Sequence, residues 1–251
     1  MFKNLFSKSV SLAVVFSLAS LSASATIVEF ETNHGNFQVN LFDTTTPKTV
    51  ENFLSYVESG HYTDTVIHRV VPDFIVQGGG FSFEGDWPLT KNQTNASVVN
   101  EPVYSNVKGT IAMAKVGGNV NSATNQWFFN LVNNSSNLDS QNGGFTAFGQ
   151  VVGDGMDTIN AIATINRCNE IPMTDFTTAE CTAASTPGIE NFVVVYSVTI
   201  VDSSTVTDAD LTPAKSTYNP EEPQQPNSGG GTFAWLTLLA LVVSSRRFFS
   251  K

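Results

Sequence analysis

A histidine and an arginine lie inside an apolar, strand-like run that continues into a glycine triplet, at residues 67–80 (IHRVVPDFIVQGGG). A permanently charged guanidinium is unusual in the middle of such a run. Arg69 brings hydrogen-bond donors, but its guanidinium neither gains nor loses a proton near neutral pH, so it cannot act as an acid or a base. The chemistry that this stretch offers is therefore electrostatic stabilisation rather than acid–base catalysis.

Other common catalytic arrangements are missing from the sequence. The three histidines, His34, His61 and His68, have neither an HxxxH nor an HxH spacing, so they do not indicate a metal site. There is no GxSxG motif, no Rossmann glycine motif and no phosphate-binding loop. Glycines 78–80 are not followed by Lys-Ser/Thr and a helix, and we interpret them as a tight turn. We expect no metal and no cofactor.

One reaction that needs an arginine but no acid–base pair is rotation about an X–Pro peptide bond. The barrier is about 20 kcal/mol, and the uncatalysed rotation takes tens of seconds or more. As the bond twists, the prolyl nitrogen becomes pyramidal and regains its lone pair, to which a fixed guanidinium can donate a hydrogen bond. An apolar pocket would hold the pyrrolidine ring, and an amide side chain would hold the substrate carbonyl.

Four blocks of the sequence resemble the cyclophilin-type peptidyl-prolyl isomerases, in the order and approximate spacing of that family. The blocks are IHRVVPDFIVQGGGF (67–81), GTIAMAK (109–115), NSATNQWFFN (121–130) and FGQVVGDGMD (148–157). The resemblance covers residues 26–203 and looks closest to the exported bacterial members. It implies a mainly β fold, a closed eight-stranded antiparallel β-barrel capped by two α-helices, with the active site on its outer face and no cofactor.

The resemblance also assigns roles to individual positions. Arg69 matches the catalytic arginine that contacts the prolyl nitrogen. Gln77 and Gln126 match polar contacts, and Ala114 and Lys115 fall where the family binds substrate through its backbone. Four apolar residues match the proline pocket: Phe74, Ile75, Phe128 and Leu138.

The sequence departs from the family at several positions near this site. Asn137 replaces a tryptophan that contacts cyclosporin in many eukaryotic members, so we expect weak cyclosporin binding. Phe145 stands where histidine or tyrosine is frequent, which removes a polar contact. Ile67 and Trp127 replace common phenylalanines and are tolerable apolar exchanges. His68 neighbours the arginine, but alternation along a strand turns it to the opposite face, so we expect a structural role.

Short alternating runs and Gly-rich turns make up most of the chain, with two amphipathic helices between them. Residues 26–42 predict a β-hairpin around Asn-His-Gly. One helix is predicted from Thr46, as N-cap, to Gly60, and a second at 155–165. Further strands are predicted at residues 109–116, 125–132, 143–152 and 191–202. This pattern favours an antiparallel barrel or sandwich whose two mouths the helices could cap.

Residues 1–25 have the order of a secretory signal peptide: two lysines, an apolar run at 12–21, and Ala-Ser-Ala at 23–25. The alternative, a buried N-terminal helix, accounts for the apolar run but not for its flanks. We therefore expect an exported protein, periplasmic, surface-attached or secreted, in a Gram-negative bacterium.

The C-terminal residues 229–251 consist of glycines, a short apolar run and two arginines. The apolar run, residues 232–243, would reach roughly 18 Å as a helix, well short of a bilayer core of ~30 Å. The segment resembles the Gly-Gly sorting signal of some Gram-negative bacteria, which implies cleavage followed by release or surface attachment. A short retained membrane anchor is the alternative.

Residues 204–228, rich in Pro, Thr, Asp and Glu, are expected to form a flexible linker after a domain at 26–203.

Charge and cysteine content narrow the functional classes further. Five of the 12 basic residues lie in the terminal segments, which leaves seven against 22 acidic residues and a net charge of −15 for the part between them. This balance argues against nucleic acid and anionic membranes as partners.

Cys168 and Cys181 are the only cysteines, and in an exported chain the pair predicts a disulfide.

The sequence thus predicts an exported, monomeric peptidyl-prolyl cis-trans isomerase that acts on proline-containing polypeptide clients and helps exported proteins to fold. One alternative is a proline-peptide binding module or holdase, in which isomerisation is incidental. Another is a surface protein that engages a host or matrix partner, although no residue identifies such a partner. Replacement of Arg69 would distinguish the isomerase from the binding module, since peptide binding can survive the loss of this residue and turnover should not.

Overall fold

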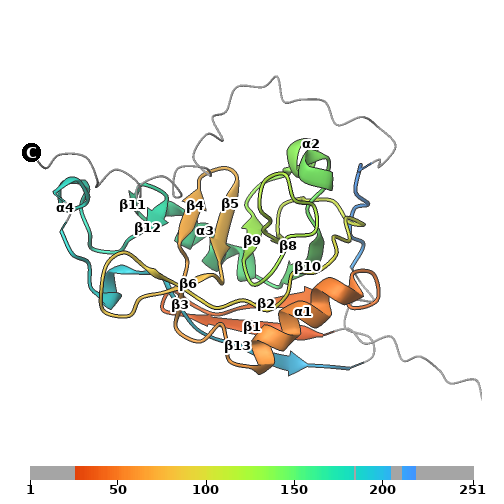
Figure 1. The fold of residues 1–251 in the computed structure, drawn as a ribbon, viewed down its shortest axis with the longest axis horizontal. Helices are drawn as coiled ribbons and strands as arrows, with labels where there is room; N and C mark the ends of the chain where they lie inside the picture. Colours follow the sequence, from red (N-terminus) through yellow and green to blue (C-terminus); the bar gives the residue numbers. More distant parts are fainter. Residues whose placement is uncertain (1–25, 184, 205–210, 219–251) are drawn as a thin grey trace, which may run out of the picture.

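A computed structural model describes residues 26–183, 185–204 and 211–218. Eleven strands form one strongly curled antiparallel sheet in the order β4-β5-β9-β8-β10-β2-β1-β13-β3-β6-β7 (Figure 1). Their bounds are β1 Ile27–Thr32, β2 Phe37–Leu41, β3 Thr65–Val66, β4 Arg69–Val71, β5 Ile75–Gly78, β6 Phe81–Ser82, β7 Thr90–Lys91, β8 Thr110–Met113, β9 Trp127–Asn130, β10 Ala147–Val152 and β13 Val194–Asp202. A separate hairpin consists of β11 Arg167–Cys168 and β12 Ile171–Pro172.

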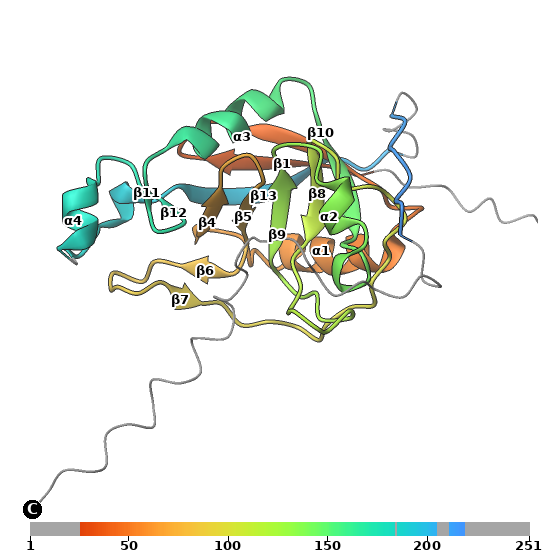
Figure 2. The same cartoon turned by 90° about the horizontal axis from the view of Figure 1, so that it is seen from above.

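Two main helices, α1 (Pro47–Glu58) and α3 (Gly155–Thr164), lie on opposite sides of the curled sheet (Figure 2). Both bury apolar side chains in the same core, among them Phe53 of α1 and Ile159 of α3. The shorter helical segments are α2 Ser135–Leu138, α4 Thr178–Thr182, η1 Gln141–Gly143 and η2 Ile189–Asn191. The predicted mainly β, barrel-like fold with two covering helices is confirmed.

The sheet differs in detail from the expected closed ring of eight strands. Among the described residues its pairing runs from β4 at one end to β7 at the other, which makes it a curled half-barrel. Several of the eleven strands are only two residues long, as in β3, β6 and β7. The helices and loops close the core where strand pairing ends.

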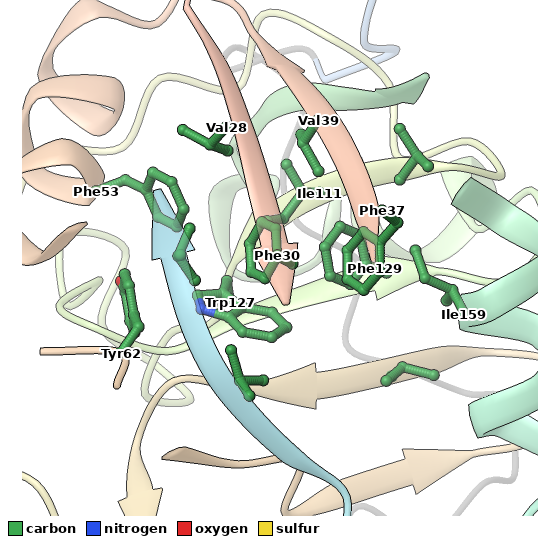
Figure 3. Packing of buried hydrophobic residues seen from close by; sticks show 14 of the residues in the cluster. Val28, Phe30, Phe37, Val39, Phe53, Tyr62, Ile111, Trp127, Phe129 and Ile159 are labelled. Carbon is green, nitrogen blue, oxygen red and sulfur yellow. The ribbon is translucent and has the colours of Figure 1, made fainter. Parts of the chain in front are cut away.

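Aromatic side chains fill the core between β1, β2 and β9 (Figure 3). The Phe30 ring lies 4.9 Å from Phe37, 5.1 Å from Trp127 and 5.5 Å from Phe129, measured between ring centroids. Trp127 and Phe129 point inward, so the intervening Phe128 must point outward. This alternation along β9 places one aromatic ring on the outer face of the sheet.

The start of α1 corrects one detail of the sequence analysis. Thr46 occupies the N-cap position, but its hydroxyl donates to the carbonyl of Phe42 and makes no cap hydrogen bond. Glu101 satisfies the free N–H groups instead, since its carboxylate accepts from Thr49 N at 2.8 Å and from Lys48 N at 3.3 Å. A residue distant in sequence therefore caps the helix, which the local pattern could not indicate.

Part of the predicted linker packs on the domain. Residues 211–218 run beside Tyr104: Ser105 N donates to Ala214 O at 2.8 Å, and Ser216 N donates to Val103 O at 3.0 Å. The ammonium of Lys215 lies 4.4 Å from the centre of the Tyr104 ring. This stretch is thus attached to the domain, whereas the sequence analysis expected flexibility throughout 204–228.

The predicted signal peptide, residues 1–25, and the predicted sorting segment, residues 229–251, lie outside the described residues. In the part of the chain that is described, no helix has both the length and the apolar character of a membrane span.

Candidate active site

A second apolar cluster, here called the outer cluster, lies on the outer face of the sheet. Its buried members are Ile75, Ala112, Phe128, Leu138 and Ala147. Along β5, β8 and β9 these residues alternate with core residues such as Val76, Ile111 and Phe129. Since successive side chains of a strand point to opposite faces, the outer cluster and the core share these strands without mixing.

The four residues predicted to form the proline pocket come together in this cluster. Ile75, Phe128 and Leu138 are buried in it, and Phe74 packs against it while remaining partly exposed. Phe145 sets its ring edge-on to Phe128, with centroids 5.8 Å apart. A buried apolar floor with a partly exposed aromatic rim suits a small apolar ring that arrives from solvent.

Strand register places Arg69 beside the outer cluster. Arg69 lies opposite Gln77, Gln77 lies opposite Phe128, and Phe128 lies opposite Ala112. Opposite residues in antiparallel strands have side chains on the same face. The four residues therefore form one row across β4, β5, β9 and β8, with the cation at one end and the apolar floor at the other.

The polar residues predicted for the site are joined by hydrogen bonds. Arg69 Nη1 donates to Gln77 Oε1 at 3.4 Å, and Gln77 Nε2 donates to Gln126 Oε1 at 2.9 Å. The other edge of the guanidinium contacts Glu170, whose Oε2 accepts from Nε at 2.6 Å. The sequence analysis did not identify Glu170. About a quarter of the Arg69 side chain (26%) stays exposed beside the outer cluster.

The glycine triplet allows a close approach between β5 and β9. A Cβ at Gly78 would lie 2.7 Å from the Trp127 ring, and a Cβ at Gly80 would lie 2.5 Å from Cγ of Gln126. Gly79 has φ of +85°, a conformation that favours glycine. The triplet therefore has a packing role: it leaves room for Gln126 next to Gln77.

Ala114 and Lys115 lie at the far side of the outer cluster. The N–H of Ala114 donates to Gln126 O at 2.9 Å, and its side chain packs on the cluster. Lys115 acts through its side chain, which the sequence analysis did not anticipate, because Nζ donates to Asn142 O at 2.9 Å and to Gly144 O at 2.6 Å. Burial lowers the pKa of Lys115 to about 8. The lysine thereby ties β8 to the loop that carries Phe145.

Buried amides hold the main chain of the rim residues Phe74 and Phe145, and a buried carboxylate anchors one of these amides. Asn134 Nδ2 donates to Phe74 O at 2.9 Å, and Asn106 Nδ2 donates to Phe145 O at 2.9 Å. Asp139 is fully buried and accepts from Asn106 N at 2.8 Å. Satisfied buried polar groups of this kind allow little movement, because each displaced group would lose its partner.

His68 packs on the ring of Phe81, with centroids 4.7 Å apart. Its Nδ1 is buried and has no hydrogen-bond partner among the described residues. Burial lowers the pKa of His68 to about 4, and the charge of Arg69 contributes to the same shift. The imidazole is therefore neutral at neutral pH, which agrees with the expected structural role.

The predicted disulfide between Cys168 and Cys181 is present. It joins the β11–β12 hairpin to α4, and both cysteines pack against a small cluster that contains Met173 and Phe192. The hairpin brings Glu170 to the edge of β4, where Val70 N donates to Glu170 O at 2.6 Å.

A curled antiparallel half-barrel with two main helices is the cyclophilin-like fold. A solved cyclophilin-type peptidyl-prolyl cis-trans isomerase from Cryptosporidium parvum aligns with a TM-score of 0.52 and 21% sequence identity, over 71% of this chain and 98% of the other. This likeness shows the fold. Arg69, Gln77 and Gln126 lie beside the outer cluster, the arrangement that the sequence resemblance implies.

The family profile described as "Cyclophilin type peptidyl-prolyl cis-trans isomerase/CLD" matches residues 27–183, so the chain belongs to this family and is a peptidyl-prolyl cis-trans isomerase. It is 38% identical over 159 residues to a "Peptidyl-prolyl cis-trans isomerase" of Acinetobacter baylyi, covering 61% of this chain and 81% of that protein. It is 39% identical over 140 residues to "Peptidyl-prolyl cis-trans isomerase B" of Escherichia coli, covering 54% and 83%.

Replacing Gly80 with alanine should displace Gln126 and leave the fold intact, because the side chain that must move is flexible. We expect kcat/KM for an X–Pro peptide to fall about tenfold, in line with the cost of misplacing a site residue. Gly117→Ala is the matched control, since a Cβ at Gly117 meets nothing within 4 Å. Equal rates for the two variants would contradict a contribution of Gln126 to the site.

The pKa of His68 predicts a loss of stability in acid. Because its folded pKa of about 4 lies below the unfolded value of 6.5, the unfolded state binds more protons between these pH values. The free energy of unfolding should fall by at most about 3 kcal/mol as the pH drops through this window, and the contribution is constant above it. Denaturant unfolding at pH 7 and pH 4.5 should show a smaller pH dependence for His68→Gln. An equal dependence in both proteins would contradict the assignment.

Proposed function

We propose that this isomerase accelerates X–Pro rotation by a hydrogen bond from Arg69 to the prolyl nitrogen while the outer cluster holds the proline ring. The observation that supports this mechanism best is the row of Arg69, Gln77 and Phe128 across three paired strands. It sets a guanidinium next to an apolar floor. A proline ring bound on Phe128 would have its nitrogen on the side of the cation.

The hydrogen bonds of Arg69 leave donors for this task. A guanidinium has five N–H groups. Three of them are directed to protein: Nε and one hydrogen of Nη2 to Glu170, and one hydrogen of Nη1 to Gln77. Among the described residues, one hydrogen on each Nη has no protein acceptor and could meet a substrate. A donor held in place before the reaction stabilises the twisted bond, in which the nitrogen is basic, more than the planar bond, in which it is not.

Gln77 and Gln126 are proposed to align the arginine and to meet the substrate main chain. Their mutual hydrogen bond of 2.9 Å holds both amides next to the pocket. Phe74 and Leu138 would enclose the ring, and the backbone at Ala114 and Lys115 would contact the residue before proline. No covalent intermediate and no proton transfer is needed in this mechanism, because only the amide resonance must be overcome.

The proposal is tested by comparing wild type with Arg69→Ala and Arg69→Lys in an X–Pro isomerisation assay. Loss of the guanidinium should lower kcat/KM by about a hundredfold or more, the scale for removal of one electrostatic donor in an active site. Lysine should restore little, because its point charge lacks the planar fork. Lys48→Ala, which removes an exposed cation on α1, serves as the control.

Binding of the same peptide, measured by titration, separates catalysis from simple recognition. We expect Arg69→Ala to bind the peptide with similar affinity and to lose turnover. A variant that keeps the wild-type rate would overturn the role of Arg69. Peptide binding without acceleration by the wild-type domain would favour a proline-peptide binding module.

We further propose that the isomerase works outside the cytoplasm on unfolded or flexible exported chains. The disulfide supports this location, since such bonds persist in oxidising compartments. The excess of acidic residues supports solubility and disfavours nucleic acid as a partner.

Export is tested by expressing the full chain in a Gram-negative host and sequencing the N-terminus of the purified protein. Cleavage after Ala25 would yield Thr26 as the first residue. We also expect the two cysteines to resist alkylation unless a reductant is added. Recovery of a cytoplasmic protein that begins at Met1 with two free thiols would refute the proposal.

A further inference from the structure

Glu170 makes two independent attachments to β4 at the position of the arginine. Its carboxylate accepts from Arg69 Nε at 2.6 Å and from Nη2 at 3.4 Å, so it engages one edge of the guanidinium with both oxygens. Its main-chain carbonyl accepts from Val70 N at 2.6 Å. One residue thus holds the backbone and the side chain of the strand that carries Arg69.

The element that presents Glu170 is well anchored. Glu170 lies in the turn between β11 and β12, next to Asn169, whose φ of +59° is in the left-handed region. The strand before the turn ends at Cys168, which the disulfide ties to Cys181. Ile171, in the strand after the turn, packs with both cysteines against a buried cluster around Phe192. The turn that carries the Glu170 carboxylate is therefore restrained on both sides, by the disulfide and by the packing of Ile171.

The two partners of Arg69 hold opposite edges of the guanidinium. Gln77 accepts from Nη1 on the side of the outer cluster, and Glu170 accepts from Nε and Nη2 on the other side. The Gln77 contact, at 3.4 Å, is as long as the contact of Glu170 to Nη2, while the contact of Glu170 to Nε is shorter, at 2.6 Å. Because a two-oxygen contact fixes a planar group in orientation as well as in position, Glu170 determines where the remaining Nη hydrogens point.

A simple surface ion pair is the alternative reading of this contact. The Glu170 side chain is 54% exposed, and exposed ion pairs contribute little to stability. The two interpretations differ in what the loss of Glu170 would change. Loss of a surface ion pair would change neither the stability nor the catalytic rate, whereas loss of an aligning contact would lower the catalytic rate alone. The backbone attachment at Val70 and the disulfide favour alignment, since neither is needed for a surface pair.

We propose that Glu170 is a positioning residue of the isomerase site, which aligns the guanidinium of Arg69 from a hairpin held by the Cys168–Cys181 disulfide. The inference rests on the proposed catalytic role of Arg69. Glu170 itself touches the arginine and not the substrate.

The first experiment measures peptide affinity and the rate at saturation for Glu170→Ala, Glu170→Gln and the control Glu58→Gln. Glu58 is an exposed carboxylate at the end of α1, so its variant removes the same charge elsewhere. We expect Glu170→Ala to lower kcat about tenfold with KM nearly unchanged, because a misaligned donor impairs the twisted state more than binding. Glu170→Gln should recover part of the loss, since its amide oxygen still accepts from Nε. A rate for Glu170→Ala within twofold of wild type, or above it, would overturn the proposal.

The second experiment tests the link to the disulfide by replacing both Cys168 and Cys181 with serine, in wild type and in Glu170→Ala. If the disulfide acts through Glu170, its loss should lower kcat several-fold in wild type and change it little in the Glu170→Ala background. Equal losses in both backgrounds would overturn the link. Thermal unfolding of each variant identifies any that fails to fold.

Arg69→Ala, measured in the same assay, separates failure of this inference from failure of the mechanism. If Arg69→Ala keeps the wild-type rate, the proposed role of Arg69 is wrong, and the role of Glu170 falls with it. If Arg69→Ala loses the rate and Glu170→Ala does not, the mechanism stands and only the positioning role is wrong.

Discussion

The alternation of side chains along three paired strands is the constraint on which both the core and the candidate site depend. On β9, Trp127 and Phe129 fill the interior while Phe128 forms the floor of the outer cluster. The same backbone therefore carries the core on one face and the proposed substrate site on the other. A shift of register by one residue would exchange the two faces, so the stability of the core also maintains the geometry of the site.

Hydrogen bonds position the parts of the candidate site that strand pairing alone does not fix. Asn134 and Asn106 hold the main chain at Phe74 and Phe145, Asp139 anchors Asn106, and Lys115 holds the loop before Phe145. On the other side of the row, Gln77 and Glu170 hold the two edges of the arginine. Most of the apolar floor thus belongs to the sheet, whereas hydrogen bonds from loops orient the rim, and Gln77 of β5 together with Glu170 of a turn orients the cation. This division suits the proposed mechanism, in which one planar donor is held steady beside a bound peptide.

Most of the strands, both main helices and the disulfide could be predicted from the sequence, because alternation, helical periodicity and an isolated cysteine pair are local signals. Ile75, Phe128 and Leu138 of the outer cluster followed from the family resemblance, since periodicity alone would have assigned Phe128 to the core, whereas Ala112 and Ala147 were not predicted. Glu101 and Glu170 were missed because each acts on a residue far away in the chain: Glu101 caps α1, and Glu170 contacts Arg69 across 101 positions. Nothing in the neighbouring sequence distinguishes either glutamate from a solvated acid.

The packing of residues 211–218 bears on how far the catalytic domain could move from a surface. Thr217 N donates to Asp139 at 3.3 Å, so the last described residues lie next to the buried polar groups behind the outer cluster. If residues 229–251 were held in a membrane, only residues 219–228 would separate the domain from it, a tether of at most about 35 Å when fully extended. The proposed active site would then stay near the membrane, where the exported chains that we propose as clients would emerge.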